Sequence, residues 1–144
     1  MIINNDALLM AQKFRAAEEK VSEERGGFYL FGLFERQQTP GRWDLVAAAP
    51  WLKTDRDGTL ELIVLLRDKM KTEDWDMIAS VFPIEPSAEY VEVITNVYTL
   101  DHQVEEVFDP SGGVYSGIYI GHAFLITSNA SPSPVSAARE LAAA

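Results

Sequence analysis

The chain has 144 residues, contains no cysteine and carries a formal net charge of −10. This length fits one domain, and 47% hydrophobic with 24% charged residues is typical of a globular protein rather than a disordered one. The absence of cysteine excludes disulfides, thiolate metal sites and a cysteine nucleophile. The negative charge opposes binding to nucleic acid and to anionic membranes, so we expect neither as a partner.

The sequence shows no signal for export or membrane insertion. Residues 1–6 include no basic segment followed by a long apolar one, so no signal peptide is predicted. The longest aliphatic run, residues 62–66, is far shorter than the ~20 residues that cross a bilayer. Together with the lack of cysteine, these features favour a cytoplasmic location.

The first part of the chain predicts a helix followed by a β-hairpin. Apolar residues recur at spacings of three and four over residues 6–24, which is the period of an amphipathic helix. A pair of glycines follows and is expected to end the helix. Residues 27–34 are apolar on both faces, as in a strand covered on both sides, and residues 43–48 are expected to return beside them after a Pro-Gly turn.

The middle of the chain predicts two helices. Residues 59–70 carry a stripe of leucines at helical spacing, with a strand over residues 60–66 as the open alternative. Thr72 is expected to cap a second helix over residues 73–82, because acidic residues follow it and a proline comes at the end.

The last third predicts strands. Residues 89–100 alternate apolar side chains on two faces, residues 103–108 form a shorter segment, and residues 114–126 form a long apolar strand. We therefore predict an α+β domain over residues 1–127. It would have an antiparallel sheet of about five strands with helices packed on it, in the order α-β-β-α-α-β-β-β. Residues 128–144 are expected to be either a tail or a short C-terminal helix.

The segment from Asp55 to Leu60, Asp-Arg-Asp-Gly-Thr-Leu, is similar to the first motif of the haloacid-dehalogenase phosphatase superfamily. The resemblance implies an aspartate nucleophile that acts with Mg²⁺. That family places the motif directly after a buried strand of a doubly wound α/β domain, whereas Lys53 and Thr54 precede it here. We therefore expect a polar loop that leads into a helix, and we assign no catalytic residue to it.

The two histidines are candidates for a ligand-binding or acid–base site. If the turn between the last two strands is tight, His102 and His122 lie on the same face of the paired strands. Glu92, within an otherwise apolar segment, and Tyr98 are the other candidates for this pocket. We predict no metal ligand and no cofactor.

Aromatic residues are concentrated in and beside the predicted hairpin. Core packing explains such residues, and an interface is the alternative, since aromatic residues and arginine are enriched at interfaces. The candidates for that interface are Phe28, Phe31 and Trp43, with Arg36 and Arg42 at the rim.

Two functions remain open. The first is a non-catalytic protein-interaction domain, either a homodimer or the partner of a basic protein. The second is a small-molecule-binding domain or a minor enzyme, with a pocket between the sheet and the helices. The first is favoured, and we do not expect an enzyme, because no constellation of catalytic residues emerges from the sequence.

Overall fold

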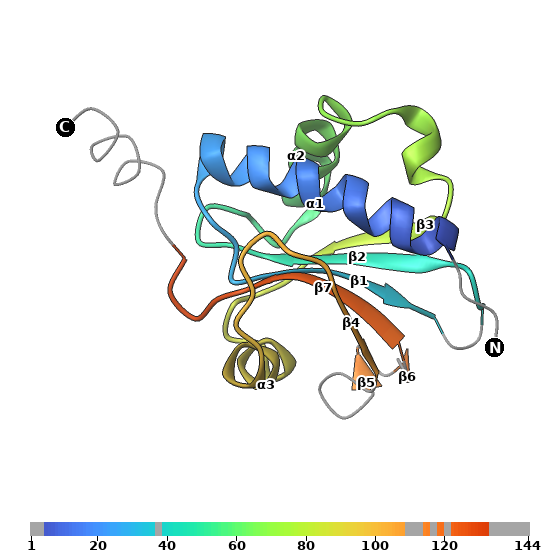
Figure 1. Ribbon diagram of the computed structural model, residues 1–144. Coiled ribbons are helices and arrows are strands. Elements are labelled where there is room, and N and C mark those ends of the chain that lie inside the picture. The colour runs from blue at the N-terminus through green and yellow to red at the C-terminus, as the bar shows by residue number, and fades with distance from the viewer. Residues whose placement is uncertain (1–4, 37–38, 109–113, 116–117, 120–121, 133–144) are drawn as a thin grey trace.

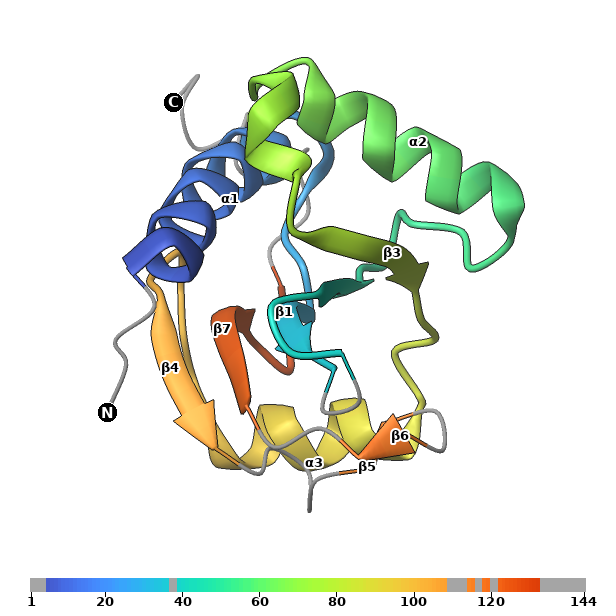
Figure 2. The same cartoon turned by 90° about the vertical axis from the view of Figure 1, so that its right-hand side faces the viewer.

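The computed structural model describes residues 5–36, 39–108, 114–115, 118–119 and 122–132. Within these residues the chain forms an α+β fold of three layers (Figures 1 and 2). A five-stranded sheet lies in the middle, α1 and α2 cover one face, and α3 covers the other. We call these the α1 face and the α3 face.

The elements follow one another in the order α1 (Asn5–Arg25), β1 (Leu30–Glu35), β2 (Trp43–Ala48), α2 (Arg56–Arg67), the 3-10 helix η1 (Thr72–Trp75), β3 (Ile78–Pro83), α3 (Glu89–Val97), β4 (Glu105–Phe108), β5 (Val114–Tyr115), β6 (Ile118–Tyr119) and β7 (His122–Ser128). The sheet has the strand order β3-β2-β1-β7-β4, and β5 pairs with β6 in a separate ribbon. The edges of the sheet are therefore β3 and β4.

The predictions for the first helix and the hairpin are confirmed. α1 buries an apolar stripe that includes Phe14 and Val21, and Gly26 follows its end with a φ of 110°. β1 and β2 pair antiparallel over their whole lengths. Their side chains are buried on both faces because helices cover the sheet from both sides.

The open alternative for residues 59–70 is settled in favour of a helix, α2, which buries Leu62 and Leu66 one turn apart. The helix α2 connects β2 to β3 and crosses one face of the sheet, so these two strands pair in parallel. The sheet is therefore mixed, and the prediction of an antiparallel sheet is wrong. The fold class itself, α+β, is confirmed.

The predicted helix over residues 73–82 is wrong, because η1 and the edge strand β3 occupy this segment. Val81 packs with the core on the α1 face and Phe82 with the core on the α3 face. Consecutive side chains can reach opposite faces of a sheet only in a strand. The apolar spacing is compatible with both structures, and the open edge of β2 selects the strand.

The predicted strand over residues 89–100 is wrong as well, because α3 occupies most of it. Val91 and Ile94 are buried against the sheet, whereas Val93 and Val97 are exposed. The same β-branched residues that suggest a strand also place an apolar stripe at helical spacing. The helix is favoured because its apolar stripe packs on the face of the sheet that α1 and α2 leave uncovered.

The strand predicted over residues 103–108 is confirmed as β4, but residues 114–126 do not form one strand. They include the short strands β5 and β6 and most of β7, which lies between β1 and β4 in the sheet. A tail or helix is predicted over residues 128–144, but Ser128 is the last residue of β7, and residues 133–144 lie outside the described residues. Within the described part, no helix is both long enough and apolar enough to cross a membrane.

Candidate functional site

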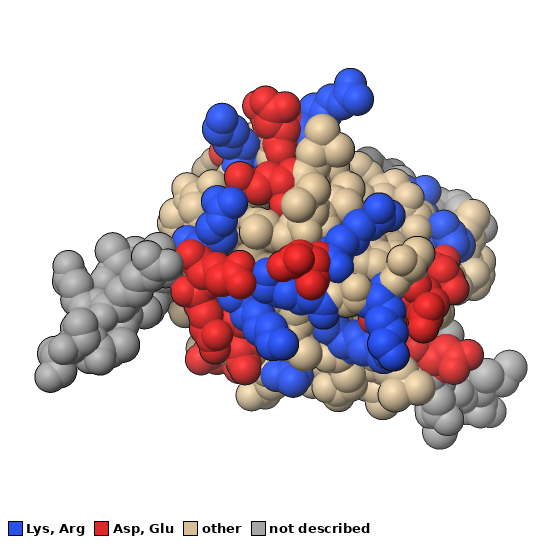
Figure 3. Space-filling view, turned by 90° about the horizontal axis from the view of Figure 1, so that it is seen from above, with Lys and Arg blue, Asp and Glu red and all other residues tan. Residues whose placement is uncertain are grey.

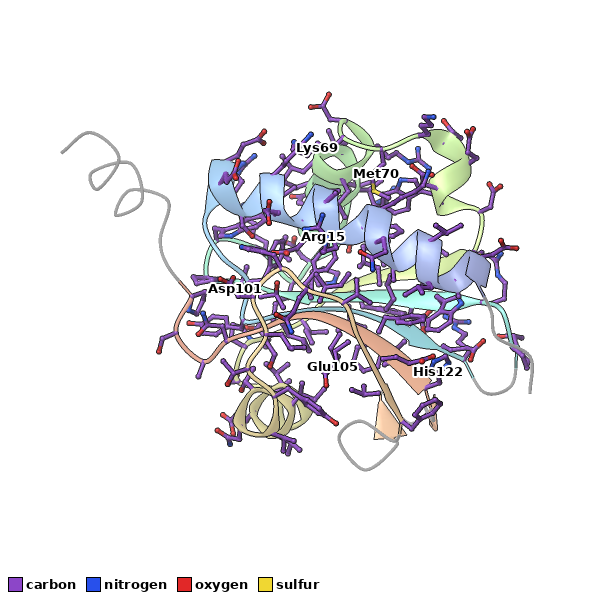
Figure 4. All side chains as sticks on the ribbon, viewed as in Figure 1. Arg15, Lys69, Met70, Asp101, Glu105 and His122 are labelled. Carbon is purple, nitrogen blue, oxygen red and sulfur yellow. The ribbon has the colours of Figure 1, made fainter. Side chains whose placement is uncertain are left out.

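His122, which is labelled in Figure 4, lies at the start of β7 and contacts two carboxylates. Its Nδ1 is 3.0 Å from Oε1 of Glu35, and its Nε2 is 2.6 Å from Oε2 of Glu106. The strand register explains the meeting, because His122 is opposite Glu35 on β1 and opposite Phe108 on β4. We call these four residues the His122 cluster.

In the His122 cluster, two carboxylates contact the two ring nitrogens of one imidazole. Phe108 stacks on this ring with centroids 4.9 Å apart and planes 9° apart. Glu35 is held in place by its other oxygen, Oε2, which accepts a hydrogen bond from Gly41 N at 2.9 Å.

His102 belongs to a different site. Its backbone N–H donates to Oγ1 of Thr127 at 3.3 Å. Thr127 is five residues from His122 on β7, which corresponds to about 17 Å along a strand. The structure therefore does not bring the two histidines together.

The His102 ring contacts Glu18, a fully buried carboxylate of α1. Oε1 of Glu18 is 2.6 Å from His102 Nδ1 and accepts a hydrogen bond from Thr127 Oγ1 at 3.0 Å, while Oε2 accepts one from Ser22 Oγ at 2.7 Å. The hydrogen bond with Glu18 raises the pKa of His102, and burial opposes this effect. We call these residues, with Asp101 at 3.1 Å from His102 Nε2, the Glu18 cluster.

The Glu18 cluster joins α1, β7 and the segment before β4, and its hydrogen bonds are internal. His102 has a φ of 54°, in the left-handed region that is strained for most residues. Because the polar atoms of Glu18 are satisfied from within the fold, we assign this cluster a structural role.

The other two pocket candidates lie on the α3 face. Glu92 is exposed on α3, and Tyr98, just after the end of α3, is half-buried against the core of that face. The four predicted pocket residues are thus divided between the two faces of the sheet. Sequence analysis also missed Glu35 and Phe108, because their proximity to His122 depends on strand register alone.

The residues predicted for an interface are buried in the core or hydrogen-bonded within the fold. Three aromatic residues are fully buried in the core: Phe28, Phe31 and Trp43. Nε of Arg36 donates to both oxygens of the buried Asp44 at 2.9 and 3.1 Å. Arg42 donates to the carbonyls of Asp76 and Ile78 at 2.8 and 3.1 Å, which ties the hairpin to the start of β3.

The motif that begins at Asp55 forms a helix start. The Asp55 side chain accepts a hydrogen bond from Gly58 N at 3.0 Å, as an N-cap of α2. A Cβ on Gly58 would lie 1.8 Å from the carbonyl oxygen of Lys53. Both residues therefore serve the local backbone, as expected for a polar loop leading into a helix.

The net charge is carried by the second half of the chain. Residues 1–71 contain 11 Lys or Arg and 11 Asp or Glu, whereas residues 72–144 contain 1 and 11. The first half includes α1 and α2, and Figure 3 shows acidic and basic side chains interspersed over this side of the molecule. The second half supplies α3 and β4, and the sequence contains no Lys or Arg from residue 72 to residue 138.

The outer face of α3 combines this acidity with exposed apolar side chains. Val93 and Val97 are 42% and 68% exposed and lie one helical turn apart. Glu92 and Asn96 are exposed beside them, again one turn apart. We call these four residues the α3 surface.

An open groove of about 410 Å³ adjoins the α3 surface. It is lined by Tyr29, Pro86, Ser87, Val91, Glu92, Thr95, Asn96 and Ala130. Its walls are both polar and apolar, and Glu92 is the carboxylate among them.

Comparison with known proteins does not assign this chain to a family. No protein-family model, no curated protein and no solved structure matches the chain. Among the residues that the structure describes, no group of three or more His, Asp and Glu side chains could hold a metal ion. The surface chemistry of the α3 face is therefore the basis for a functional conclusion.

Proposed function

We propose that this protein is a non-catalytic interaction module that binds a basic partner protein through the α3 surface. One observation carries the proposal. The helix α3, which exposes Val93 and Val97, belongs to the half of the chain that has an excess of ten negative charges. Exposed apolar side chains supply burial on binding, and the carboxylate of Glu92 beside them favours a partner of opposite charge.

The charge distribution also favours a different partner over a second copy of the same chain. Two α3 surfaces that met in a symmetric dimer would bring Glu92 of each copy to one acidic interface, and like charges oppose such a contact. We therefore expect the purified protein to be a monomer in light scattering, and a basic partner to form the complex.

The groove supports a peptide segment as the element that the partner contributes. An open groove lined by residues of α3 and by Tyr29 exposes its length to solvent, whereas small-molecule sites enclose most of their ligand. A Lys or Arg of a segment in this groove would contact Glu92, which belongs to both the groove and the α3 surface.

The test is photo-crosslinking of the full chain in the cells that naturally express it, with the photoreactive residue at position 97. The matched control carries it at position 64, because Val64 on α2 is 66% exposed and lies on the opposite side of the sheet. We expect a basic protein to be crosslinked at position 97 and not at position 64. Equal products at both positions would contradict the proposal.

A binding measurement with the purified partner then makes the result quantitative. Val97→Glu should weaken binding about tenfold, because it places a charge in the apolar part of the contact, and Glu92→Lys should also weaken it. Val64→Glu adds the same charge at a similarly exposed valine and should leave the affinity unchanged. Unchanged binding by Val97→Glu and Glu92→Lys would exclude the α3 surface.

A further inference from the structure

We propose that the exposed end of β4 binds an arginine side chain of the partner, with the guanidinium stacked on Phe108 and hydrogen-bonded to Glu106. This inference rests on the proposed function for the basic character of the partner. It adds a second contact point, on the opposite face of the sheet from α3.

The two residues are arranged to receive a cation. Glu106 and Phe108 are two positions apart on β4, so their side chains project to the same face of the sheet. The Phe108 residue is 67% exposed and the Glu106 side chain is 50% exposed. A large exposed aromatic ring beside a carboxylate can bind a cation through the ring face and the carboxylate oxygens together.

His122 shows which kind of cation fits. Its planar ring stacks on Phe108 with centroids 4.9 Å apart, and its Nε2 is 2.6 Å from Glu106. One planar nitrogen-containing ring therefore already contacts both the aromatic ring and the carboxylate. The exposed part of Phe108 offers a second position of the same chemistry. A guanidinium is planar, always charged and rich in donors, and it stacks on aromatic rings, whereas a lysine ammonium is a compact point charge.

The electrostatic surroundings favour the same ligand. Among the described residues, Glu106 and Glu35 place two carboxylates around the His122 ring, one at each ring nitrogen. The chain supplies no Lys or Arg between residues 72 and 138 that could occupy the position. β4 is also an edge strand, so a partner can approach it from the side (Figure 2).

The test is an NMR titration of the full chain with an acetylated and amidated tri-arginine peptide. Side-chain signals of Phe108 and His122 report on the β4 site, and methyl signals of Val93 and Val97 report on the α3 surface. We expect saturable shifts at Phe108 and His122. The same peptide with citrulline in place of arginine keeps the planar shape but lacks the charge, and it should produce no saturable shift.

Three variants make the assignment specific. Phe108→Leu and Glu106→Gln should each weaken the binding that is observed at His122 by about two- to fivefold, as for an exposed cation–π contact or ion pair. Glu105→Gln removes the same charge from the neighbouring residue, whose side chain projects to the α3 face, and should leave this binding nearly unchanged. All three positions are exposed, so backbone spectra should confirm that the variants keep the fold.

The outcomes separate this inference from the proposed function. No shift at Phe108 and His122, or equal weakening by Glu105→Gln and Glu106→Gln, overturns the arginine site, whatever the valine methyl groups report. Shifts confined to Val93 and Val97 overturn it while supporting the α3 surface. Shifts confined to Phe108 and His122, with binding weakened in Glu106→Gln but not in Glu105→Gln, support the arginine site and count against the α3 surface.

Discussion

Oε1 of Glu18 lies 2.6 Å from Nδ1 of His102, although the two residues are 84 positions apart and the Glu18 side chain is fully buried. A buried carboxylate is costly unless it is paired and hydrogen-bonded, and here Thr127 and Ser22 satisfy it together with the imidazole. The pair thereby joins α1 to the segment before β4 through a titratable side chain.

We predict that this pair makes stability depend on pH. Glu18 raises the pKa of His102 above its ordinary value of 6.5, so protons are bound more tightly in the folded state. The stabilisation is fully present below the unfolded pKa and is lost as the pH rises through the folded pKa. The free energy of unfolding of the wild type, measured with urea, should therefore decline as the pH rises above 6.5, the ordinary pKa of histidine.

His102→Asn is the matched variant for this measurement. Asparagine tolerates the left-handed backbone, with its φ of 54°, better than most residues and does not titrate. Because His122 is present in both proteins, the difference between wild type and variant isolates His102. That difference should shrink as the pH rises, and a difference that is constant with pH would contradict the prediction.

Two arginines of the hairpin should differ in their importance for stability. Arg36→Met leaves the carboxylate of Asp44, which is buried, without its charged partner, and we expect a loss of about 3 kcal/mol. Arg42→Met removes exposed hydrogen bonds to two carbonyls and should cost about 1 kcal/mol. Urea unfolding of both variants measures the contrast, and equal losses would mean that burial of Asp44 does not set the cost.

Gly58→Ala should destabilise the protein by about 2 kcal/mol, because a Cβ at this position collides with the carbonyl of Lys53 and the backbone must move. Gly41→Ala is an informative comparison. Its Cβ would meet nothing within 4 Å, but its φ of +85° is unfavourable for alanine and should cost about 1 kcal/mol. Thermal unfolding should therefore rank Gly58→Ala as the more severe variant, and the reverse order would contradict the close contact.

Two substitutions test whether α3 packs with Ile94 toward the sheet and Val97 toward solvent. Ile94→Ala empties a fully buried position and should cost about 3 kcal/mol. Val97→Ala changes an exposed position and should alter stability by less than about 0.5 kcal/mol. Similar losses at the two positions in urea unfolding would be inconsistent with this packing.

The elements that sequence predicted correctly are those whose apolar period has a single interpretation. α1 has many turns with one buried stripe, and the hairpin strands are apolar on both faces around a Pro-Gly turn. Residues 73–82 and 89–97 carry apolar side chains that suit a helix or a strand equally well. The neighbouring elements decide between them, because β2 has a free edge for one segment and the sheet has an uncovered face for the other.

The candidate sites divide in the same way. The excess of acidic residues is a property of the sequence, and a count by halves places it in residues 72–144. The meeting of His122 with Glu35, 87 positions away, depends on the register of β7 against β1. A shift of one residue would send His122 to the opposite face, so no local pattern could predict the cluster.

Composition and local periodicity are enough to establish the absence of thiol chemistry, the acidic balance and the α+β class. The parallel pairing of β2 with β3, the position of α3 and the partners of His102 and His122 emerge only when the chain has packed. These features are contacts between segments far apart in the chain, and their free energy depends on which surfaces remain uncovered when the rest of the sheet has formed.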